Sequence, residues 1–227
     1  MMENFEPLNN PVWVALNSGN SHLAQGGALA RSFQERISPF VGLKDFSKHA
    51  FAALETIPTE LPMAIVSKEL VTPTNTFEVL QREKILQMVF QEETVEKLNP
   101  DSVRLGKLHV PLMLELTQLT KPGPFLEHTI RFGNYFGIFE SERLAGMAGR
   151  RFHADGFIEI SAVCTHPDFS GRGYAGKLML AEVARILSED SMPYLHVRPA
   201  NEGAIRLYQK LGFGIHQEVN LLVFKKN

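Results

Sequence analysis

The feature that most constrains this chain is an apolar strand that runs into a glycine-rich loop and then into a helix. The strand is predicted over residues 157–165, glycines follow at Gly171, Gly173 and Gly176, and a helix-forming run covers residues 177–187. Glycine lets the backbone turn where a Cβ atom would clash. The first N–H groups of a helix have no partner within the helix and lie at the positive end of its dipole. Together these features predict a backbone site for an anion, and phosphate is the usual guest of such sites.

Two common phosphate-binding motifs overlap in this loop, and neither fits the rest of the chain. Residues 171–176 match G-x-G-x-x-G, and with Lys177 they match G-x-x-x-x-G-K. The second motif is a P-loop, which needs Ser or Thr after the lysine to coordinate Mg²⁺, but Leu178 stands there. The first is a dinucleotide fingerprint, but the chain after Gly176 is too short for a doubly wound sheet of about six strands. Arg198, which could bind a 2′-phosphate, keeps a nicotinamide enzyme open as an alternative.

The composition fits a chain that buries a core, and it excludes several classes of protein. Apolar residues make up 44% and charged residues 21% of the 227 residues. The net charge is −2, so there is no broad basic field for a nucleic acid. The apolar runs are too short to cross a bilayer, and the first residues do not have a signal-peptide pattern. Cys164 stands alone and excludes an internal disulfide, so we predict a cytoplasmic protein without nucleic acid or membrane partners.

The predicted elements fall into two regions, with the boundary placed in the polar stretch 91–100, at residue 95. The first region, residues 1–95, is predicted as an α/β region and carries no sharp chemical motif. Its expected strands are 12–16 and 63–66, its expected helices are 27–37 and 46–57, and residues 77–90 are ambiguous between strand and helix.

The second region, residues 96–227, has a clearer order of elements. Expected helices are 110–119, 177–187 and 204–211, and expected strands are 135–139, 144–152, 157–165, 194–198 and one or two within 215–224. Strands joined by hairpins are followed here by a strand–helix–strand–helix–strand run. This order predicts an α/β fold with a mixed sheet and helices on its faces.

The glycine loop also fits a cradle for the diphosphate of coenzyme A. It reads Ser170-Gly-Arg-Gly-Tyr-Ala175 and resembles the signature of the GNAT superfamily of N-acetyltransferases, Arg/Gln-x-x-Gly-x-Gly/Ala, which stands between that family's fourth strand and third helix. The glycine and the alanine match at Gly173 and Ala175. Ser170 departs from the usual Arg or Gln, so one side-chain contact is lost or altered there, whereas the backbone donors are unaffected.

The resemblance continues after the loop and covers about residues 103–224. In this family an Asn and a Tyr follow on the next strand–helix unit, which ends in a Gly-Phe pair. Asn201, Tyr208 and Gly212-Phe213 stand in that arrangement here. The hairpin over residues 135–152 and the helix before it also match the family's order of elements.

The resemblance implies a fold, an acyl donor and a set of contacts. Residues 96–227 are expected to form a GNAT-like acyltransferase domain, and residues 1–95 an additional region that could be a divergent extra domain. Acetyl-CoA is the implied donor, with its pantetheine arm between the strands at 160–165 and 194–198. The implied cofactor-binding residues are Val163, Cys164, Thr165, Gly171, Arg172, Gly173, Tyr174, Ala175, Gly176 and Asn201.

Glu159 is the expected catalytic base. It lies 14 residues before Gly173, a spacing that resembles the base glutamate of a histone acetyltransferase branch of the family. Alternate residues of a strand share a face, so Glu159, Ser161 and Val163 are expected to point one way. In the other reading, Glu159 is satisfied by a neighbouring arginine or is exposed at the start of the strand. Amines near neutral pH are mostly protonated, so a base is useful either directly or through water.

Tyr208 is the expected catalytic acid, because the resemblance implies that it protonates the leaving thiolate of coenzyme A. The competing interpretation is a buried helical stripe made by Ala204, Leu207, Tyr208 and Leu211. Asn201 has two readings as well, as a contact to coenzyme A and as the N-cap of the following helix.

Cys164 is interpreted as a small residue on a buried strand rather than as a nucleophile. His196 could line the acceptor pocket. The eight histidines show no metal-ligand spacing, so we predict no metal site. The expected function is direct transfer of an acetyl group from acetyl-CoA to a small-molecule amine. The alternative is a non-catalytic module that binds or senses acyl-CoA, and a homodimer is left open as an assembly.

Overall fold

The fold is described by a computed structural model, which covers residues 4–34, 36–59, 61–95 and 101–227. Its strands are β1 (Ala24–Gly26), β2 (Ala30–Phe33), β3 (Val41–Leu43), β4 (Met63–Ser67), β5 (Phe77–Phe90), β6 (Val103–Arg104), β7 (Phe136–Glu140), β8 (Arg143–Ala154), β9 (Phe157–Thr165), β10 (Met192–Val197) and β11 (Phe213–Lys226). Its helices are α1 (Pro11–Asn17), α2 (Lys48–Glu55), α3 (Val110–Thr120), α4 (Tyr174–Leu187) and α5 (Glu202–Lys210).

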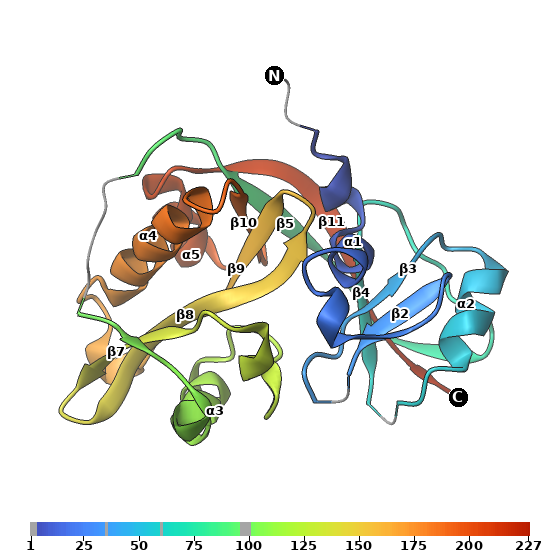
Figure 1. Cartoon of the computed structure of the whole chain (residues 1–227), viewed down its shortest axis with the longest axis horizontal. Coiled ribbons are helices and arrows are strands. Elements are labelled where there is room, and N and C mark those ends of the chain that lie inside the picture. The colour runs from blue at the N-terminus through green and yellow to red at the C-terminus, as the bar shows by residue number, and fades with distance from the viewer. Residues whose placement is uncertain (1–3, 35, 60, 96–100) are drawn as a thin grey trace.

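Within the described residues, eight strands form one mixed sheet in the order β4-β11-β5-β10-β9-β8-β7-β6. Strands β9 and β10 are parallel, as a crossover helix between them requires, and the other neighbouring pairs are antiparallel. A smaller sheet, β1-β2-β3, lies beside the β4 end of the large sheet (Figure 1). The prediction of an α/β fold with a mixed sheet is confirmed.

Helices cover both faces of the large sheet (Figure 1). On one face, α1 and α3 pack in the same apolar cluster as Phe157 and Tyr194. On the other face, α4 packs on Ile158, Ile160 and Leu195, and α5 adds its partly buried apolar residues. Successive residues of a strand point to opposite faces, so each central strand is apolar on both sides.

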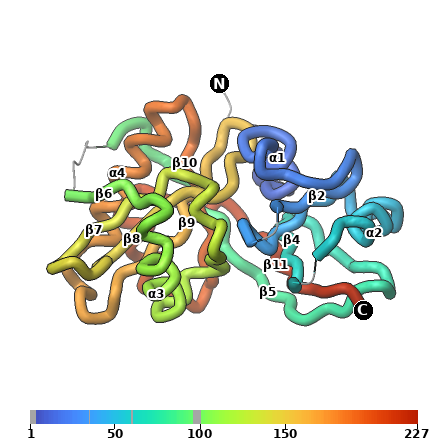
Figure 2. The backbone as a smooth tube through the Cα atoms, turned by 60° about the horizontal axis from the view of Figure 1, so that its bottom comes forward, coloured from blue at the N-terminus to red at the C-terminus, as the bar shows by residue number. Residues whose placement is uncertain are grey.

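The two regions predicted from the sequence contribute to the same large sheet. Strand β5 pairs with β10 and, over most of its length, with β11, and β11 also pairs with β4 (Figure 2). The predicted boundary adjoins residues 96–100, which lie outside the described residues. The division at residue 95 therefore stays a prediction, while the pairing shows which strands from each side of it are joined.

Two elements of the first region were predicted wrongly. Residues 12–16 form helix α1 rather than a strand, because Pro11 starts a helix well and a short apolar run does not distinguish the two structures. Residues 27–37 contain strand β2 rather than a helix, and β2 is hydrogen-bonded on both sides by β1 and β3. Sheet pairing here overrides the helix propensity of the Ala-Leu-Ala run.

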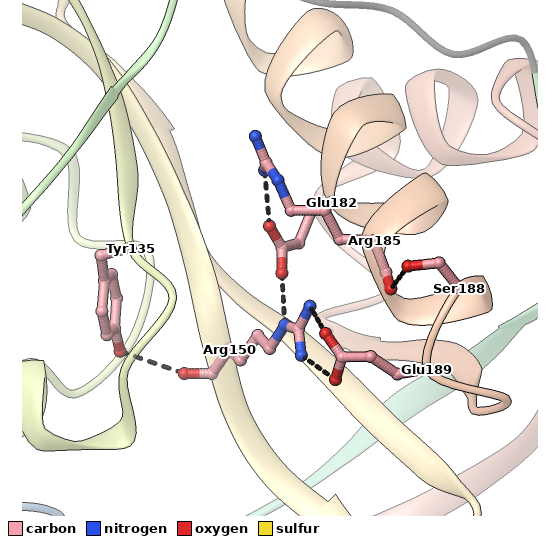
Figure 3. A network of polar contacts seen from close by, with 6 residues as sticks. All are labelled: Tyr135, Arg150, Glu182, Arg185, Ser188 and Glu189. Carbon is pink, nitrogen blue, oxygen red and sulfur yellow. Dashed lines mark hydrogen bonds and ion pairs between the residues drawn. The ribbon is translucent and has the colours of Figure 1, made fainter.

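A buried ionic cluster attaches helix α4 to strand β8 (Figure 3). Arg150 of β8 donates from Nε to Glu182 of α4 and from both terminal nitrogens to Glu189, at 2.7 and 2.9 Å. Arg185 donates to the second oxygen of Glu182 at 2.9 Å, and the Tyr135 hydroxyl donates to the Arg150 carbonyl. A buried arginine requires such pairing, and the bidentate geometry fixes the helix on the strand.

In the described part of the chain, no helix is long and apolar enough to cross a membrane.

Candidate active site

The glycine loop leads directly into helix α4, which begins at Tyr174, three residues earlier than predicted. Gly171 and Gly173 have φ values of +78° and +77°, and Gly173 is the N-cap of the helix. Glycine adopts this left-handed conformation without the strain that other residues incur. Among the described residues, none accepts a hydrogen bond from the backbone amides of residues 171–176. The loop thus presents a row of backbone donors at the positive end of a helix, which is the arrangement that binds phosphate groups.

Strands β9 and β10 separate beside this loop. Their parallel pairing runs from Met192 opposite Phe157 to Tyr194 opposite Glu159 and goes no further. A cavity of about 370 Å³ opens where they part. Its walls include Val163, Cys164 and Thr165 from β9, His196 and Val197 from β10, and Arg198, Asn201 and Tyr208 beyond β10. The sequence prediction of an opening between these two strands is therefore matched by a cavity.

A bulge in β9 changes the face of the sheet to which the following residues of the strand point. Ala162 has a φ of +53°, and the pairing with β8 shifts register between Gly149 opposite Ser161 and Met147 opposite Cys164. As a result, Val163 packs in the clusters of α4, while Ala162 and Cys164 join the cluster of α3. The expectation that Glu159, Ser161 and Val163 share one face is wrong, because strict alternation fails across a bulge.

Tyr208 lines the cavity and is half-buried on helix α5. Burial, together with the neighbouring Cys164, raises the pKa of its hydroxyl to about 12, so the group carries its proton at neutral pH. Helix α5 is positioned by the start of α4, since a Cβ at Gly176 would lie 3.8 Å from Leu207 and 3.9 Å from Leu211. This packing ties the glycine loop to the helix that carries Tyr208.

Asn201 lines the cavity and also caps helix α5, because its Oδ1 accepts from the Ala204 amide at 3.2 Å. The N-cap reading of this residue is confirmed, and its contact with coenzyme A stays a prediction. The side chain of Arg172 lies near Glu140 and the Phe169 ring, and the Tyr174 hydroxyl donates to Glu140. These two residues can therefore contribute to an anion site through their backbone amides.

Glu159 is buried and does not line the cavity. Its Oε2 accepts from Nε of Arg151 at 2.7 Å, and its Oε1 accepts from Nη2 of Arg151 at 2.5 Å and from Nδ1 of His196 at 2.8 Å. Although burial opposes ionisation, the charge of Arg151 and these hydrogen bonds lower the pKa of Glu159 to about 2. This arrangement matches the alternative interpretation of Glu159 from the sequence, in which the carboxylate is paired with a neighbouring arginine.

His196 connects this pair to the N-terminal region. Its Nε2 lies 3.1 Å from Nε2 of Gln87, which also lies 3.1 Å from the Leu8 carbonyl. An amide nitrogen can donate but not accept, so His196 accepts at Nε2 and donates from Nδ1 to Glu159. His196 lines the cavity, and its place beside an acceptor stays a prediction.

Cys164 is buried, and burial raises the pKa of its thiol to about 11. A thiol in this state is a poor nucleophile, which agrees with its interpretation as a packing residue. Among the described residues, no group of His, Cys, Asp and Glu could hold a metal ion.

Sequence reasoning missed several residues of the cavity. Arg151 lies on β8, with its guanidinium stacked on the rings of Phe40 and Phe152 at 4.8 and 4.6 Å. The loop at residues 120–124 forms a further wall, and Phe40 comes from the first region. The Pro-Gly-Pro run at 122–124 is itself a local signal for a rigid loop, but the other residues have no local signal because long-range packing brings them together.

Comparisons with known proteins agree with this geometry. The FR47-like protein family matches residues 135–221. The crystal structure of a GNAT-family protein from Novosphingobium aromaticivorans aligns with a TM-score of 0.89 and 32% identity, covering 98% of this chain and 99% of that chain. A GCN5-related N-acetyltransferase from Kribbella flavida aligns with a TM-score of 0.61 over 95% of both chains, and at 13% identity it shows the fold alone.

One curated relative matches a part of the chain. The mycothiol acetyltransferase of Corynebacterium aurimucosum is 30% identical over 86 residues, which are 36% of this chain. The aligned stretch spans 28% of that enzyme's length.

Proposed function

The chain belongs to the GNAT family of N-acetyltransferases, and on that premise we propose that it moves an acetyl group from acetyl-CoA to a small amine in the cavity between β9 and β10. The observation that carries the proposal is the junction of two features. A row of backbone donors lies at the start of α4, and a cavity opens between the strands that precede α4 and follow it.

The donor is held through the backbone. Amides of residues 171–176 bind the diphosphate of acetyl-CoA at the positive end of α4. The pantetheine arm lies along β9 at Val163, Cys164 and Thr165, where the neighbouring strand β10 has turned away. The same stretch of main chain offers N–H groups to the thioester oxygen, and such donors stabilise the charge that develops there. Asn201 contributes a further contact from the cavity wall.

The chemical step is a direct transfer. The neutral amine attacks the thioester carbonyl carbon, a C–N bond forms, the C–S bond breaks, and the thiolate leaves. Tyr208 gives a proton to this thiolate and then regains one from water, a role supported by its position on the cavity wall. Water takes the proton that the amine loses. We assign the base to water because Glu159 has both oxygens engaged and a pKa of about 2.

The test is Tyr208→Phe, measured as thiol release from acetyl-CoA across a panel of amines. We expect kcat to fall by about 10²–10⁴-fold, with the affinity for acetyl-CoA unchanged by calorimetry. Tyr194→Phe is the matched control, because its hydroxyl is buried and has no hydrogen-bond partner among the described residues. An unchanged kcat in Tyr208→Phe removes it as the acid. Binding of acetyl-CoA without turnover of any amine by the wild type would favour a sensing module instead.

Three further statements stay predictions of the sequence. They are the cytoplasmic location, the small-molecule nature of the acceptor, and a homodimer as an open assembly.

A further inference from the structure

The cavity extends from the residues proposed to bind acetyl-CoA, here called the donor residues, to an apolar wall built largely by the N-terminal region. Val66 of β4 is paired with Leu221 of β11, and Ile85 lies on β5, the next strand of the sheet. Phe40 joins them, and all four residues line the cavity. This wall lies on β4, β11 and β5, whereas the donor residues lie on and beyond β9 and β10. An acceptor bound here therefore presents apolar surface to this wall.

Cationic side chains line the same cavity, and among the described residues its lining includes no aspartate or glutamate. The cations are Lys121, Arg151 and Arg198. Arg198 is engaged with Glu83 through three contacts of 2.9–3.2 Å. The carboxylate that meets Arg151 is buried behind it and does not face the cavity. A cavity lined in this way favours an acceptor that carries a negative charge.

Arg151 has donors left for such a charge. A guanidinium carries five N–H donors in a fixed plane, and Glu159 takes one from Nε and one from Nη2. Stacking on Phe40 and Phe152 holds the plane in place. The side chain is 13% exposed, and it lines the cavity. The remaining donors can bind a carboxylate, for which the geometry of arginine is well suited.

We propose that the acceptor is a free apolar α-amino acid, with its carboxylate on Arg151, its side chain against Phe40, Val66, Ile85 and Leu221, and its α-amine turned toward the donor residues. The inference rests on the proposed function. In an α-amino acid the amine and the carboxylate are attached to the same carbon, so a carboxylate bound to Arg151 keeps the amine close to Arg151. His196, joined to Arg151 through Glu159, lines the same cavity. A cavity of about 370 Å³ suits a small acceptor beside the end of a pantetheine arm.

The first experiment compares L-leucine, L-leucinamide and 3-methylbutylamine as acceptors for the full chain, measured as thiol release from acetyl-CoA. Leucinamide keeps the side chain and loses the charge, and 3-methylbutylamine loses the carboxylate altogether. The amine of leucinamide is the less basic, so free-amine chemistry alone favours leucinamide over leucine. We expect the opposite order, with kcat/KM for leucine higher by about 10–100-fold, because a charged hydrogen bond is lost with the carboxylate.

The second experiment uses Arg151→Lys, which keeps the charge but has fewer donors. The KM for leucine is expected to rise about tenfold, with the Kd for acetyl-CoA unchanged. Arg206→Lys, at an exposed pair with Glu202, is the matched control. A thermal melt reports whether Arg151→Lys is folded, and the comparison of acceptors on the wild type does not depend on it.

The outcomes separate the two proposals. Equal or better turnover of leucinamide, or acetylation of a peptide amino terminus in place of leucine, overturns the acceptor inference and leaves acetyl-CoA as donor. Turnover of leucine with acetyl-CoA bound supports both. Failure of acetyl-CoA to bind the folded chain in calorimetry overturns the proposed function, and the acceptor inference with it.

Discussion

Arg150 and Arg151 are neighbours on strand β8, and each forms a buried ion pair with a glutamate, but they serve opposite faces of the sheet. Arg150 points to α4, where Glu182 and Glu189 bind it (Figure 3). Arg151 points to the other face, where Glu159 binds it and Phe40 stacks on it. The same chemistry is thus used twice within two residues, once in the scaffold and once beside the cavity.

The difference lies in how completely each guanidinium is used. Arg150 donates from Nε and from both terminal nitrogens to two carboxylates. Among the described residues, Arg151 has one carboxylate partner, Glu159, which accepts from its Nε and Nη2. Each nitrogen of Arg150 therefore bonds a carboxylate, and this guanidinium joins two elements. The Nη1 of Arg151 bonds no carboxylate among the described residues, so a guanidinium that borders a cavity in this way can also bind a ligand. Buried charge alone therefore does not identify a functional residue, and the donors that remain have to be counted.

The largest expected effect comes from Glu159→Gln. The substitution leaves Arg151 buried without a counter-charge, and removing one partner of a buried pair costs about 3–5 kcal/mol. Urea unfolding at pH 7 measures the loss. The freed guanidinium can also move, so we expect a raised KM for the acceptor with little change in the Kd for acetyl-CoA.

Glu159→Gln also tests the assignment of water as the base. If the glutamate were the base, kcat would fall by about 10²–10⁴-fold in the folded fraction, because a general base contributes that much. A variant that is as stable as the wild type would instead show that Arg151 does not depend on this carboxylate, and the comparison of the two arginines would lose its basis.

Local patterns explain what could be predicted from the sequence. The elements within residues 110–224 were predicted because hairpins, glycines and helical stripes are local signals. The residues that we propose to bind acetyl-CoA were predicted from the loop between β9 and α4 and from Asn201, and the proposed acid was predicted from the position of Tyr208. Helix α1 was missed because a short apolar run does not distinguish a helix from a strand, and strand β2 was missed because pairing with β1 and β3 overrides its local helix propensity.

The acceptor side of the site could not be predicted in this way. The role of Arg151 depends on Phe40 and Glu159, which reach it from other parts of the fold. The sheet face to which Val163 points depends on the bulge at Ala162. A positive φ at an alanine cannot be predicted from the residue type, because alanine rarely adopts this conformation. Glu159 was singled out, but its burial and its partners could not be deduced without the packing.

The next largest expected effect is a loss of stability at low pH that is caused by protonation of Glu159. Its folded pKa of about 2 lies below the ordinary value of 4.5, so its ionised form stabilises the fold above about pH 4.5. That stabilisation, about 3 kcal/mol, is lost as the pH falls from 4.5 through 2. Unfolding free energies of the wild type and Glu159→Gln, measured from pH 6 to pH 2, should therefore converge in acid. A constant difference across this range would contradict the lowered pKa.

A smaller effect is expected for Glu182→Gln on the scaffold side. Glu182 accepts from Arg150 and from Arg185, and the single oxygen of Gln can keep one of these two bonds. Since Arg150 also keeps its bidentate bond to Glu189, one charged hydrogen bond is lost, at a cost of about 2 kcal/mol. The variant should retain the wild-type kcat and KM, because Arg150, Glu182 and Glu189 do not line the cavity. Kinetic constants measured at a temperature well below the melting point check this. A changed KM for the acceptor would mean that the two faces are coupled through β8.

The smallest effect is expected for Glu189→Gln. This carboxylate binds the same buried arginine through two bonds, yet its side chain is 50% exposed. Solvent screens the charge it presents, so the loss should be about 1 kcal/mol or less in urea unfolding. Compared with Glu159→Gln, this variant removes the same type of pair, but the carboxylate is more exposed and the arginine keeps a second partner in Glu182. If both substitutions cost the same, neither the burial of the carboxylate nor the second partner sets the strength of these pairs. Arg151 would then be no more dependent on Glu159 than Arg150 is on Glu189.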